Sequence, residues 1–231
     1  MEITILQADR VRSSLRMEFG DYPDMFKELF VERSSNSLTI KVIECAEMRY
    51  PKEATSDVYI ITGSHNSVYD DEPWIAALVS FVEKILRGGS KLVGICFGHQ
   101  LIAHFFGGKT EEIGWVLGAQ KINILESFGD QESPTEGFCL LSTHKDQVTV
   151  LPKGARLVAC SESCPNSGYA IDNQILTLQS HPEFSKDYFR ALLQLRKKEL
   201  VKSDYVSGID SLELVTNQGE AGDWMLSFLK Y

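Results

Sequence analysis

The sequence has no run of apolar residues long enough to cross a bilayer, and basic residues are scarce in it. Lysine and arginine together number 23 against 32 acidic residues, which gives a formal net charge of −9. The sequence also contains no basic block and no interleaving of basic with aromatic residues. These absences argue against a membrane surface or a nucleic acid as the main partner.

Cysteine occurs five times, an odd number that lacks the paired spacing of a metal site, at positions 45, 96, 139, 160 and 164. Cys160 and Cys164 lie four positions apart, but no second pair of ligands follows them, so we expect no metal. The first residues read as a strand and do not have the pattern of a secretory signal peptide. We therefore expect free thiols, a reducing cytoplasmic location and no cofactor.

Short apolar runs alternate with amphipathic segments in the first half of the chain. This order predicts an α/β fold with a mostly parallel central sheet flanked by helices, of the flavodoxin-like type. The expected strands are 3–7, 38–43, 57–62 and 92–95. The expected helices begin near Asp21 and at about residues 74 and 100, and the last two end near residues 87 and 106.

Beyond Gly108 the strand candidates follow one another without long helices between them, which predicts an added antiparallel portion. They are residues 111–116, 120–125, 138–142, 157–161 and a hairpin, 169–172 with 174–179. Helices follow at about 185–201 and 219–229. The last one gathers Ala221, Trp224, Met225, Phe228 and Leu229 on one face, which we expect to pack on the chain's own core and not on a partner. We expect residues 1–231 to form a single domain, with the C-terminal helices of about 185–231 packed on it.

The segment around Cys96 carries the strongest chemical signal. An apolar strand, 92–95, runs directly into a helix sequence, and Gly94 and Gly98 flank the cysteine at the junction. Small residues let the strand and the helix approach closely at a sharp reversal, as in a nucleophile elbow. Such a turn exposes the sulfur at the strand tip and places it at the positive end of the helix, which favours the thiolate.

A second candidate follows the strand that ends near residue 178. His181 lies just past that strand end, as Cys96 does, and strand tips at one edge of such a sheet are where sites gather. Glu183 is two positions further on, so in extended backbone its carboxylate faces the same way as the imidazole. A cysteine nucleophile, an imidazole base and an orienting carboxylate are what thiol-dependent acyl transfer requires.

Together these motifs resemble the class I (triad) glutamine amidotransferase family. The resemblance rests on Gly94-Ile-Cys96-Phe-Gly98-His-Gln100, on His181-Pro-Glu183 and on the loop Thr62-Gly63-Ser64, and it covers about residues 3–184. The stretches around Trp74 and Glu112-Ile-Gly-Trp115 look closest to stand-alone members that resemble the amidotransferase half of GMP synthase. The loop departs from the family, since many relatives carry a Gly-Pro or Gly-Gly pair there.

Matching positions imply roles for individual residues. The resemblance implies that Cys96 attacks the glutamine side-chain amide, that His181 is the base and then the acid, and that Glu183 holds its tautomer. It also implies an oxyanion hole made by backbone amides of Gly63, Ser64 and Phe97, and substrate contacts made by Gln100, Thr143 and His144, with Asp146 bracing the loop that carries the last two.

Blander interpretations stand beside these roles. Gln100 can simply extend the start of the helix, and His144 can be a loop histidine bonded to Asp146. His65, His99 and His104 are expected to be structural or solvated, and the cysteines other than Cys96 to be inert thiols.

The implied activity is hydrolysis of the glutamine side-chain amide through a γ-glutamyl thioester on Cys96, with a small-molecule substrate. The chain is too short to include a synthase domain, so ammonia would pass to a separate synthase subunit. The alternative is a stand-alone γ-glutamyl peptidase or hydrolase acting on glutathione-like substrates. A third hypothesis, a non-catalytic thiol-sensing relative, does not need His181 and Glu183 and is the least favoured.

Overall fold

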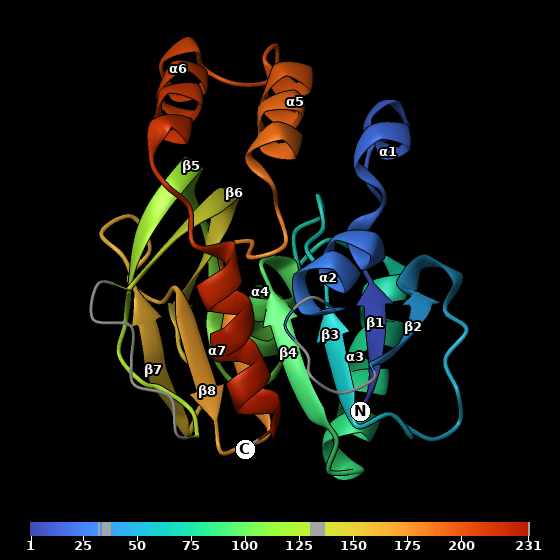
Figure 1. The fold of residues 1–231 in the computed structure, drawn as a ribbon. Helices are drawn as coiled ribbons and strands as arrows, with labels where there is room; N and C mark the ends of the chain where they lie inside the picture. Colours follow the sequence, from blue (N-terminus) through green and yellow to red (C-terminus); the bar gives the residue numbers. More distant parts are fainter. Residues whose placement is uncertain (32, 34–37, 130–136, 231) are drawn as a thin grey trace.

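The computed structural model describes residues 1–31, 33, 38–129 and 137–230, and its centre is one mixed sheet (Figure 1). The strands are β1 (Glu2–Gln7), β2 (Thr39–Glu44), β3 (Val58–Ile61), β4 (Lys91–Ile95), β5 (Lys109–Ile124), β6 (Phe138–Val150), β7 (Ala155–Cys160), β8 (Gly168–Ile171) and β9 (Ile175–Leu178). The helices are α1 (Ser13–Phe19), α2 (Tyr22–Val31), α3 (Pro73–Arg87), α4 (Phe97–Phe105), α5 (Lys186–Arg196), α6 (Lys202–Asp210) and α7 (Gln218–Lys230). Two short 3-10 turns, η1 (Cys45–Glu47) and η2 (Ser211–Glu213), complete the described secondary structure.

The strands follow the order β2-β1-β3-β4-β9-β8-β7-β5-β6 across the sheet. Neighbouring strands from β2 to β9 run parallel, whereas β9, β8, β7, β5 and β6 pair antiparallel in turn. Every residue of β3, β9 and the apolar part of β4 is buried, as expected of strands covered on both faces. This confirms the prediction of an α/β fold with a parallel centre and an added antiparallel portion.

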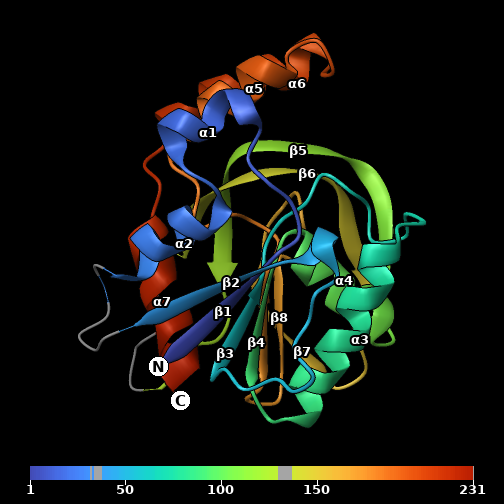
Figure 2. The ribbon, with the colours of Figure 1, turned by 90° about the vertical axis from the view of Figure 1, so that its right-hand side faces the viewer.

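Helices cover both faces of the sheet. Figure 2 shows α2 and α7 on one side and α3 and α4 on the other. In α3 the apolar stripe, which includes Leu78 and Val82, is buried against the sheet. In α7 the apolar face predicted from the sequence is also buried, and the Trp224 indole donates a hydrogen bond to the backbone oxygen of Glu126 at 2.9 Å. The α7 face therefore packs on the chain's own core, as expected.

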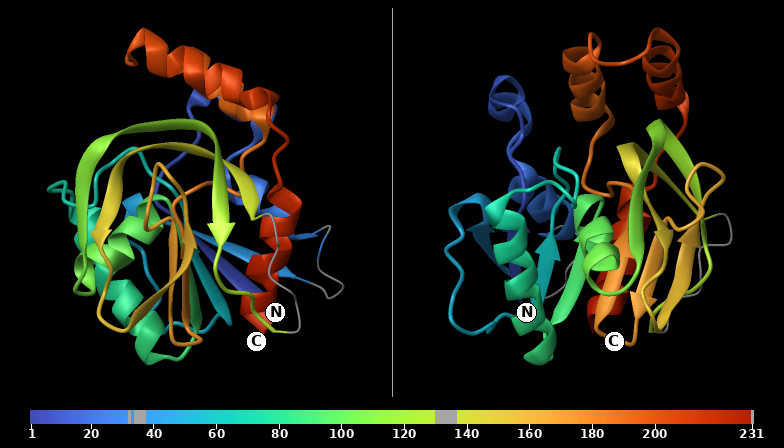
Figure 3. Two further views of the ribbon diagram at one scale, coloured as in Figure 1. Left: turned by 90° about the vertical axis from the view of Figure 1, so that its left-hand side faces the viewer. Right: turned by 180° about the vertical axis from the view of Figure 1, so that it is seen from behind.

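The remaining helices, α1, α5 and α6, lie beyond the carboxyl ends of the parallel strands (Figures 1 and 3). They share a separate apolar cluster that includes Val11, Tyr188, Phe189 and Leu193. The N-terminus and the end of α7 lie at the opposite edge of the sheet. These helices thus surround the carboxyl edge of the parallel strands on its outer side. None of the described helices is long and apolar enough to span a membrane.

Two helix predictions need correction. The predicted helix 185–201 ends at Arg196, and a separate helix, α6, follows it, because Val201 adopts extended backbone and redirects the chain. Gly208 of α6 then packs on Leu117 of β5, a contact that a straight helix would not reach. Helix α1 was not predicted, since none of its residues is buried and it has no apolar periodicity to detect.

The boundaries of three predicted strands were also wrong. Residues 111–116 and 120–125 belong to one continuous strand, β5, whose pairing with β6 shifts between Glu112 and Val116. Gly118, which lies between the two predicted strands, has a φ angle of 97° inside β5, and Gly114, with φ 130°, lies at the shift in pairing. The strand predicted at 138–142 continues to Val150, so Thr143 and His144 lie in β6 and not in a loop.

Candidate active site

The backbone reverses sharply at Cys96, between β4 and α4. Cys96 has φ 51° and ψ −100°, a conformation that non-glycine residues rarely adopt. Its N–H donates to the oxygen of Leu178, and its oxygen accepts from the N–H of Gln100. A Cβ atom at Gly94 would lie 2.6 Å from the backbone carbon of Gly98, and one at Gly98 would lie 2.7 Å from Cβ of Ile61. Only glycine fits at both positions, which agrees with the close approach of strand and helix predicted from the sequence.

Replacing Gly94 with alanine is expected to lower the free energy of unfolding by about 1–3 kcal/mol, because the new methyl group overlaps the backbone of α4. Denaturant unfolding measures this change. Ser80→Ala on the exposed side of α3 is a suitable control, since its hydroxyl bonds only to its own helix at Ala76 and the expected change is within about 0.5 kcal/mol. Equal stabilities for the two variants would mean that the elbow is not closely packed.

His181 and Glu183 form a buried pair directly after β9. The N–H of His181 donates to the oxygen of Leu141, and its Nδ1 lies 2.7 Å from Oε1 of Glu183. The imidazole stacks on the Phe184 ring with centroids 3.9 Å apart. The His181 side chain is 3% exposed and that of Glu183 is 0% exposed. Backbone pairing, stacking and the carboxylate together restrict the imidazole to one orientation.

The His181 ring also contacts Cys96. A Cβ atom at Gly63 would lie 2.8 Å from Cε1 of His181 and 3.6 Å from Cβ of Cys96, so the three residues converge on one point. Burial by itself lowers the pKa of His181, but the Glu183 carboxylate and the nearby Cys96 sulfur outweigh it and raise that pKa above its usual value. The Glu183 carboxylate thus favours the protonated form of the imidazole beside the Cys96 sulfur.

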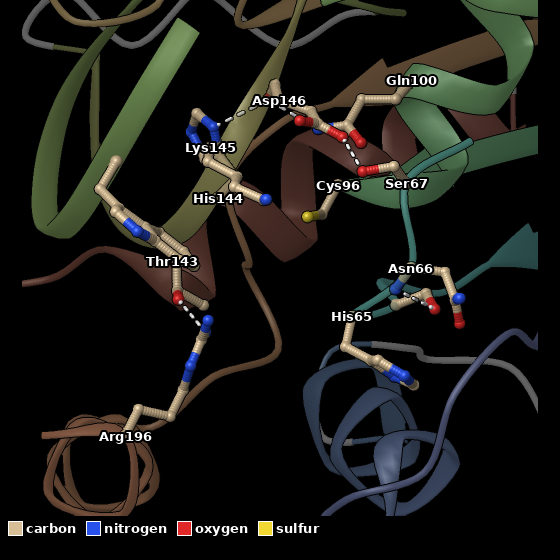
Figure 4. A pocket seen from close by; sticks show the side chains of 12 residues that line it. His65, Asn66, Ser67, Cys96, Gln100, Thr143, His144, Lys145, Asp146 and Arg196 are labelled. Atoms are coloured by element: carbon tan, nitrogen blue, oxygen red, sulfur yellow. Dashed lines mark hydrogen bonds between the residues drawn. The ribbon is translucent and has the colours of Figure 1, made fainter. Parts of the chain in front are cut away.

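A cavity of about 230 Å³ opens on one side of Cys96 (Figure 4). Its lining residues are Ser64, His65, Asn66, Ser67, Cys96, Gln100, Trp115, Thr143, His144, Lys145, Asp146 and Arg196. We refer to it as the first cavity. Nε2 of Gln100 donates to the backbone oxygen of Asp146 at 2.8 Å and to Oε1 of Gln179 at 3.0 Å. Gln100 therefore does more than extend the helix: it ties α4 to β6 beneath the cavity.

The two residues predicted to contact substrate, Thr143 and His144, both line the first cavity. The Thr143 hydroxyl accepts a hydrogen bond from Nη1 of Arg196 at 3.1 Å. Burial lowers the pKa of His144 to about 4, so its ring is neutral at pH 7. Because Nδ1 of His144 lies 3.1 Å from the oxygen of Asp146, that nitrogen carries the proton and Nε2 is left as an acceptor.

Asp146 braces a different segment from the one predicted. Its carboxylate accepts hydrogen bonds from the Ser67 hydroxyl at 2.5 Å and the Tyr69 hydroxyl at 3.0 Å. These bonds hold the far end of the loop that starts at Gly63, whereas Thr143 and His144 are held by the strand pairing of β6. At the near end of the loop, His65 bonds to the Asp9 carboxylate through both its backbone N–H and its ring.

A smaller cavity of about 80 Å³, the second cavity, adjoins the first and is also lined by Cys96. It is lined by Asp9, Arg10, Arg12, Tyr22, Gly63, Ser64, His65, Cys96, Thr143, His181, Phe184, Tyr188, Leu192 and Arg196. His181 lines the second cavity and not the first, whereas Gln100 and His144 line only the first. Cys96 thus lines two adjoining cavities whose other residues differ in chemistry.

Of the three residues predicted to form the oxyanion hole, two line the cavities and one does not. Gly63 and Ser64 line the cavities, but Phe97 does not, and its ring packs against Trp74 with centroids 5.4 Å apart. As the first residue of α4, Phe97 has a backbone N–H without an intrahelical partner, so a contribution from that amide remains compatible with the structure.

Several residues at the site had no signal in the sequence. Asp9, Arg12 and Arg196 come from the turn after β1 and from α5, which only the three-dimensional packing brings to this edge. His65 was expected to be structural or solvated; it is exposed and paired with Asp9, yet it lines both cavities. Trp115 stacks beneath the Arg196 guanidinium at 4.6 Å. The sequence had pointed to Trp115 only through the resemblance.

The other histidines and cysteines fit the bland interpretation. His99 is buried and bonded to the Thr177 hydroxyl at 2.9 Å, and burial lowers its pKa to about 3. All five cysteines are free, and burial raises the pKa of Cys45 to about 12 and that of Cys164 to about 11. A thiol with so high a pKa is a poor nucleophile at pH 7.

Fold and site together define an α/β protein with a thiol at a strand-to-helix elbow, facing a buried histidine–carboxylate pair. The family model "Glutamine amidotransferase class-I" matches residues 20–195, so the chain belongs to the class I glutamine amidotransferase family. γ-Glutamyl peptidase 3 of Arabidopsis thaliana is 31% identical over 185 residues, which are 75% of this chain and 73% of that protein.

Two further comparisons concern one relative by sequence and one solved structure. The glutamine-hydrolysing GMP synthase of Aromatoleum aromaticum is 33% identical over 135 residues, which are 54% of this chain but only 25% of the synthase. The crystal structure of a glutamine amidotransferase from Thermotoga maritima has a TM-score of 0.72 and 20% identity, and covers 99% of this chain and 96% of its own. The latter likeness supports the fold alone.

Proposed function

We propose that this protein hydrolyses γ-glutamyl amides through a thioester on Cys96, and that its physiological substrates are γ-glutamyl peptides. The observation that carries the proposal is the convergence of Cys96 with the buried His181–Glu183 pair beside a cavity of about 230 Å³. A cavity of this size suits one amino-acid-sized group. The cationic side chains of Arg196 and Lys145 at its wall suit the α-carboxylate of a γ-glutamyl group.

The first half-reaction uses each member of the triad once. The Cys96 sulfur attacks the γ-carbonyl carbon, and the amides of Ser64, Gly63 or Phe97 stabilise the developing oxyanion. When the C–N bond breaks, His181 gives the proton that came from the thiol to the departing amine. Glu183 holds the imidazole with its proton-bearing Nδ1 toward the carboxylate, so that Nε2 serves the reaction.

Water completes the cycle in the second half-reaction. His181 removes a proton from the water that attacks the thioester carbonyl, and it returns that proton to the sulfur as the C–S bond breaks. The products are glutamate and the regenerated thiol. No redox change and no further reactant is required.

The peptidase assignment is preferred to ammonia transfer for two reasons. A relative that is similar over most of both chains bears the name γ-glutamyl peptidase, whereas the GMP synthase matches over a quarter of its own length. The second cavity, in addition, leaves room on the His181 side of the thiol for a leaving group larger than ammonia. Glutamine hydrolysis coupled to a separate synthase subunit is the second candidate.

A substrate screen of the purified protein tests the proposal. We expect γ-glutamyl peptides to be cleaved at their γ-amide without a partner protein, and mass spectrometry of rapidly quenched samples to detect a γ-glutamyl adduct on the peptide that contains Cys96. Slow turnover of glutamine alone, stimulated by a co-purifying synthase, would support the second candidate. Rapid alkylation of Cys96 without hydrolysis of any γ-glutamyl compound would favour the thiol-sensing hypothesis.

A further inference from the structure

The second cavity concentrates positive charge in a protein that carries a net charge of −9. Three arginines line it, at positions 10, 12 and 196, together with a single carboxylate, Asp9. A positively charged recess of this kind favours an anionic ligand over a neutral one.

The hydrogen bonds and ion pairs of the charged residues in the second cavity show which arginine is free to bind an anionic ligand. Asp9 accepts hydrogen bonds from both donors of His65 and from the N–H of Arg10, so its charge is engaged. Arg10 forms an ion pair with Glu44. Arg196 bonds to Thr143 and Glu199. For the Arg12 side chain, the described part of the chain provides no hydrogen bond and no ion pair.

Although its side chain is exposed, Arg12 has a rigidly held backbone. The preceding turn is fixed by the bond from the Val11 N–H to the Asp21 carboxylate at 2.8 Å and by the bond from the Ala8 N–H to the Thr62 hydroxyl at 3.0 Å. The Arg16 guanidinium further secures the turn by donating to the oxygen of Val11. A fixed backbone with an uncommitted guanidinium is a suitable carboxylate-binding position.

The position of His181 decides which part of a substrate enters this cavity. The group that protonates the departing amine must lie on the leaving-group side of the scissile bond. His181 lines only the second cavity, whereas the residues with which a γ-glutamyl group is expected to interact line the first. The leaving group therefore belongs in the second cavity, among the arginines.

On the basis of the proposed function, we propose that the second cavity binds the leaving amine of a γ-glutamyl peptide and that Arg12 selects leaving groups that carry a carboxylate. The substrate class is thus γ-glutamyl amino acids and short γ-glutamyl peptides, and not free glutamine. The volume of about 80 Å³ favours a small residue next to the scissile amide. Its amine nitrogen would receive the proton from His181, and its carboxylate would lie at the exposed rim beside Arg12.

Three substrates with the same acyl group isolate the contribution of Arg12: γ-glutamylglycine, γ-glutamylglycinamide and glutamine. We expect the wild-type protein to prefer γ-glutamylglycine to its amide by about three- to tenfold in kcat/KM, a magnitude suited to a partly solvated charge pair. Added salt should reduce this preference. In Arg12→Gln the preference should disappear, because kcat/KM for γ-glutamylglycine falls to the value for its amide; in Arg12→Lys it should largely persist.

Arg87→Gln is the matched control, because Arg87 is an exposed arginine at the end of α3 that pairs with Glu83. We expect this variant to retain the wild-type preference, and both variants to unfold at the wild-type midpoint. Hydrolysis of all three substrates without preference, or a preference that survives in Arg12→Gln, would overturn the inference alone. Hydrolysis of none of the three would overturn the proposed function and this inference with it.

Discussion

Cys96→Ala is expected to abolish cleavage of γ-glutamyl compounds, with a loss of at least about 10⁴-fold in kcat, and to leave the fold intact. The loss is large because the sulfur is the only described group at the elbow that can form the acyl intermediate, and removing a nucleophile disables the whole triad. Steady-state kinetics measures the loss, and mass spectrometry should detect no acyl adduct. Cys96 is 5% exposed, and alanine leaves its backbone partners unchanged.

The matched control for this variant is Cys164→Ala. Cys164 is also buried and free, but burial raises its pKa to about 11, so it should not react at pH 7. We expect Cys164→Ala to keep nearly full activity and a normal adduct on Cys96. Retention of hydrolysis in Cys96→Ala, or loss of it in Cys164→Ala alone, would contradict the assignment of the nucleophile.

Much of the site was predictable because its catalytic residues belong to short sequence motifs. The elbow around Cys96 requires glycine at positions where a Cβ atom would overlap neighbouring atoms. These glycines, on either side of the cysteine, can be recognised in the sequence. His181 and Glu183 are two positions apart, and extended backbone alone brings their side chains to the same side. The prediction that two segments 85 positions apart meet depended only on both following neighbouring parallel strands, β4 and β9.

The remaining parts were not predictable for reasons that concern packing. Arg12 and Arg196 line a cavity beside Cys96 because α1 and α5 pack against each other through an apolar cluster, and no local spacing in the sequence indicates that packing. The continuity of β5 was missed because Gly118, between the two predicted strands, looks like a turn residue, whereas its pairing with Ser142 of β6 keeps it in the strand. Thr143 and His144 were assigned to a loop because they are polar. They lie in the strand β6, where they border the first cavity.

Glu183→Gln is expected to lower kcat by about 10²- to 10⁴-fold while the variant still folds. A glutamine amide can turn its NH₂ toward Nδ1 of His181, which selects the tautomer whose proton is on Nε2. That nitrogen then cannot accept the thiol proton. The amide also removes the negative charge that raises the pKa of His181, so that pKa should fall.

The pH profile separates this electrostatic role from a merely structural one. The imidazolium form of His181 is lost as pH rises through its pKa, so a lower pKa should move the alkaline limb of kcat/KM to lower pH in Glu183→Gln. Glu126→Gln is the control, because Glu126 also pairs with a cation, Arg156 at 2.8 Å, but does not line either cavity. An alkaline limb that stays in place in Glu183→Gln would show that the carboxylate does not set the charge of the imidazole, and the triad assignment would then lose its third member.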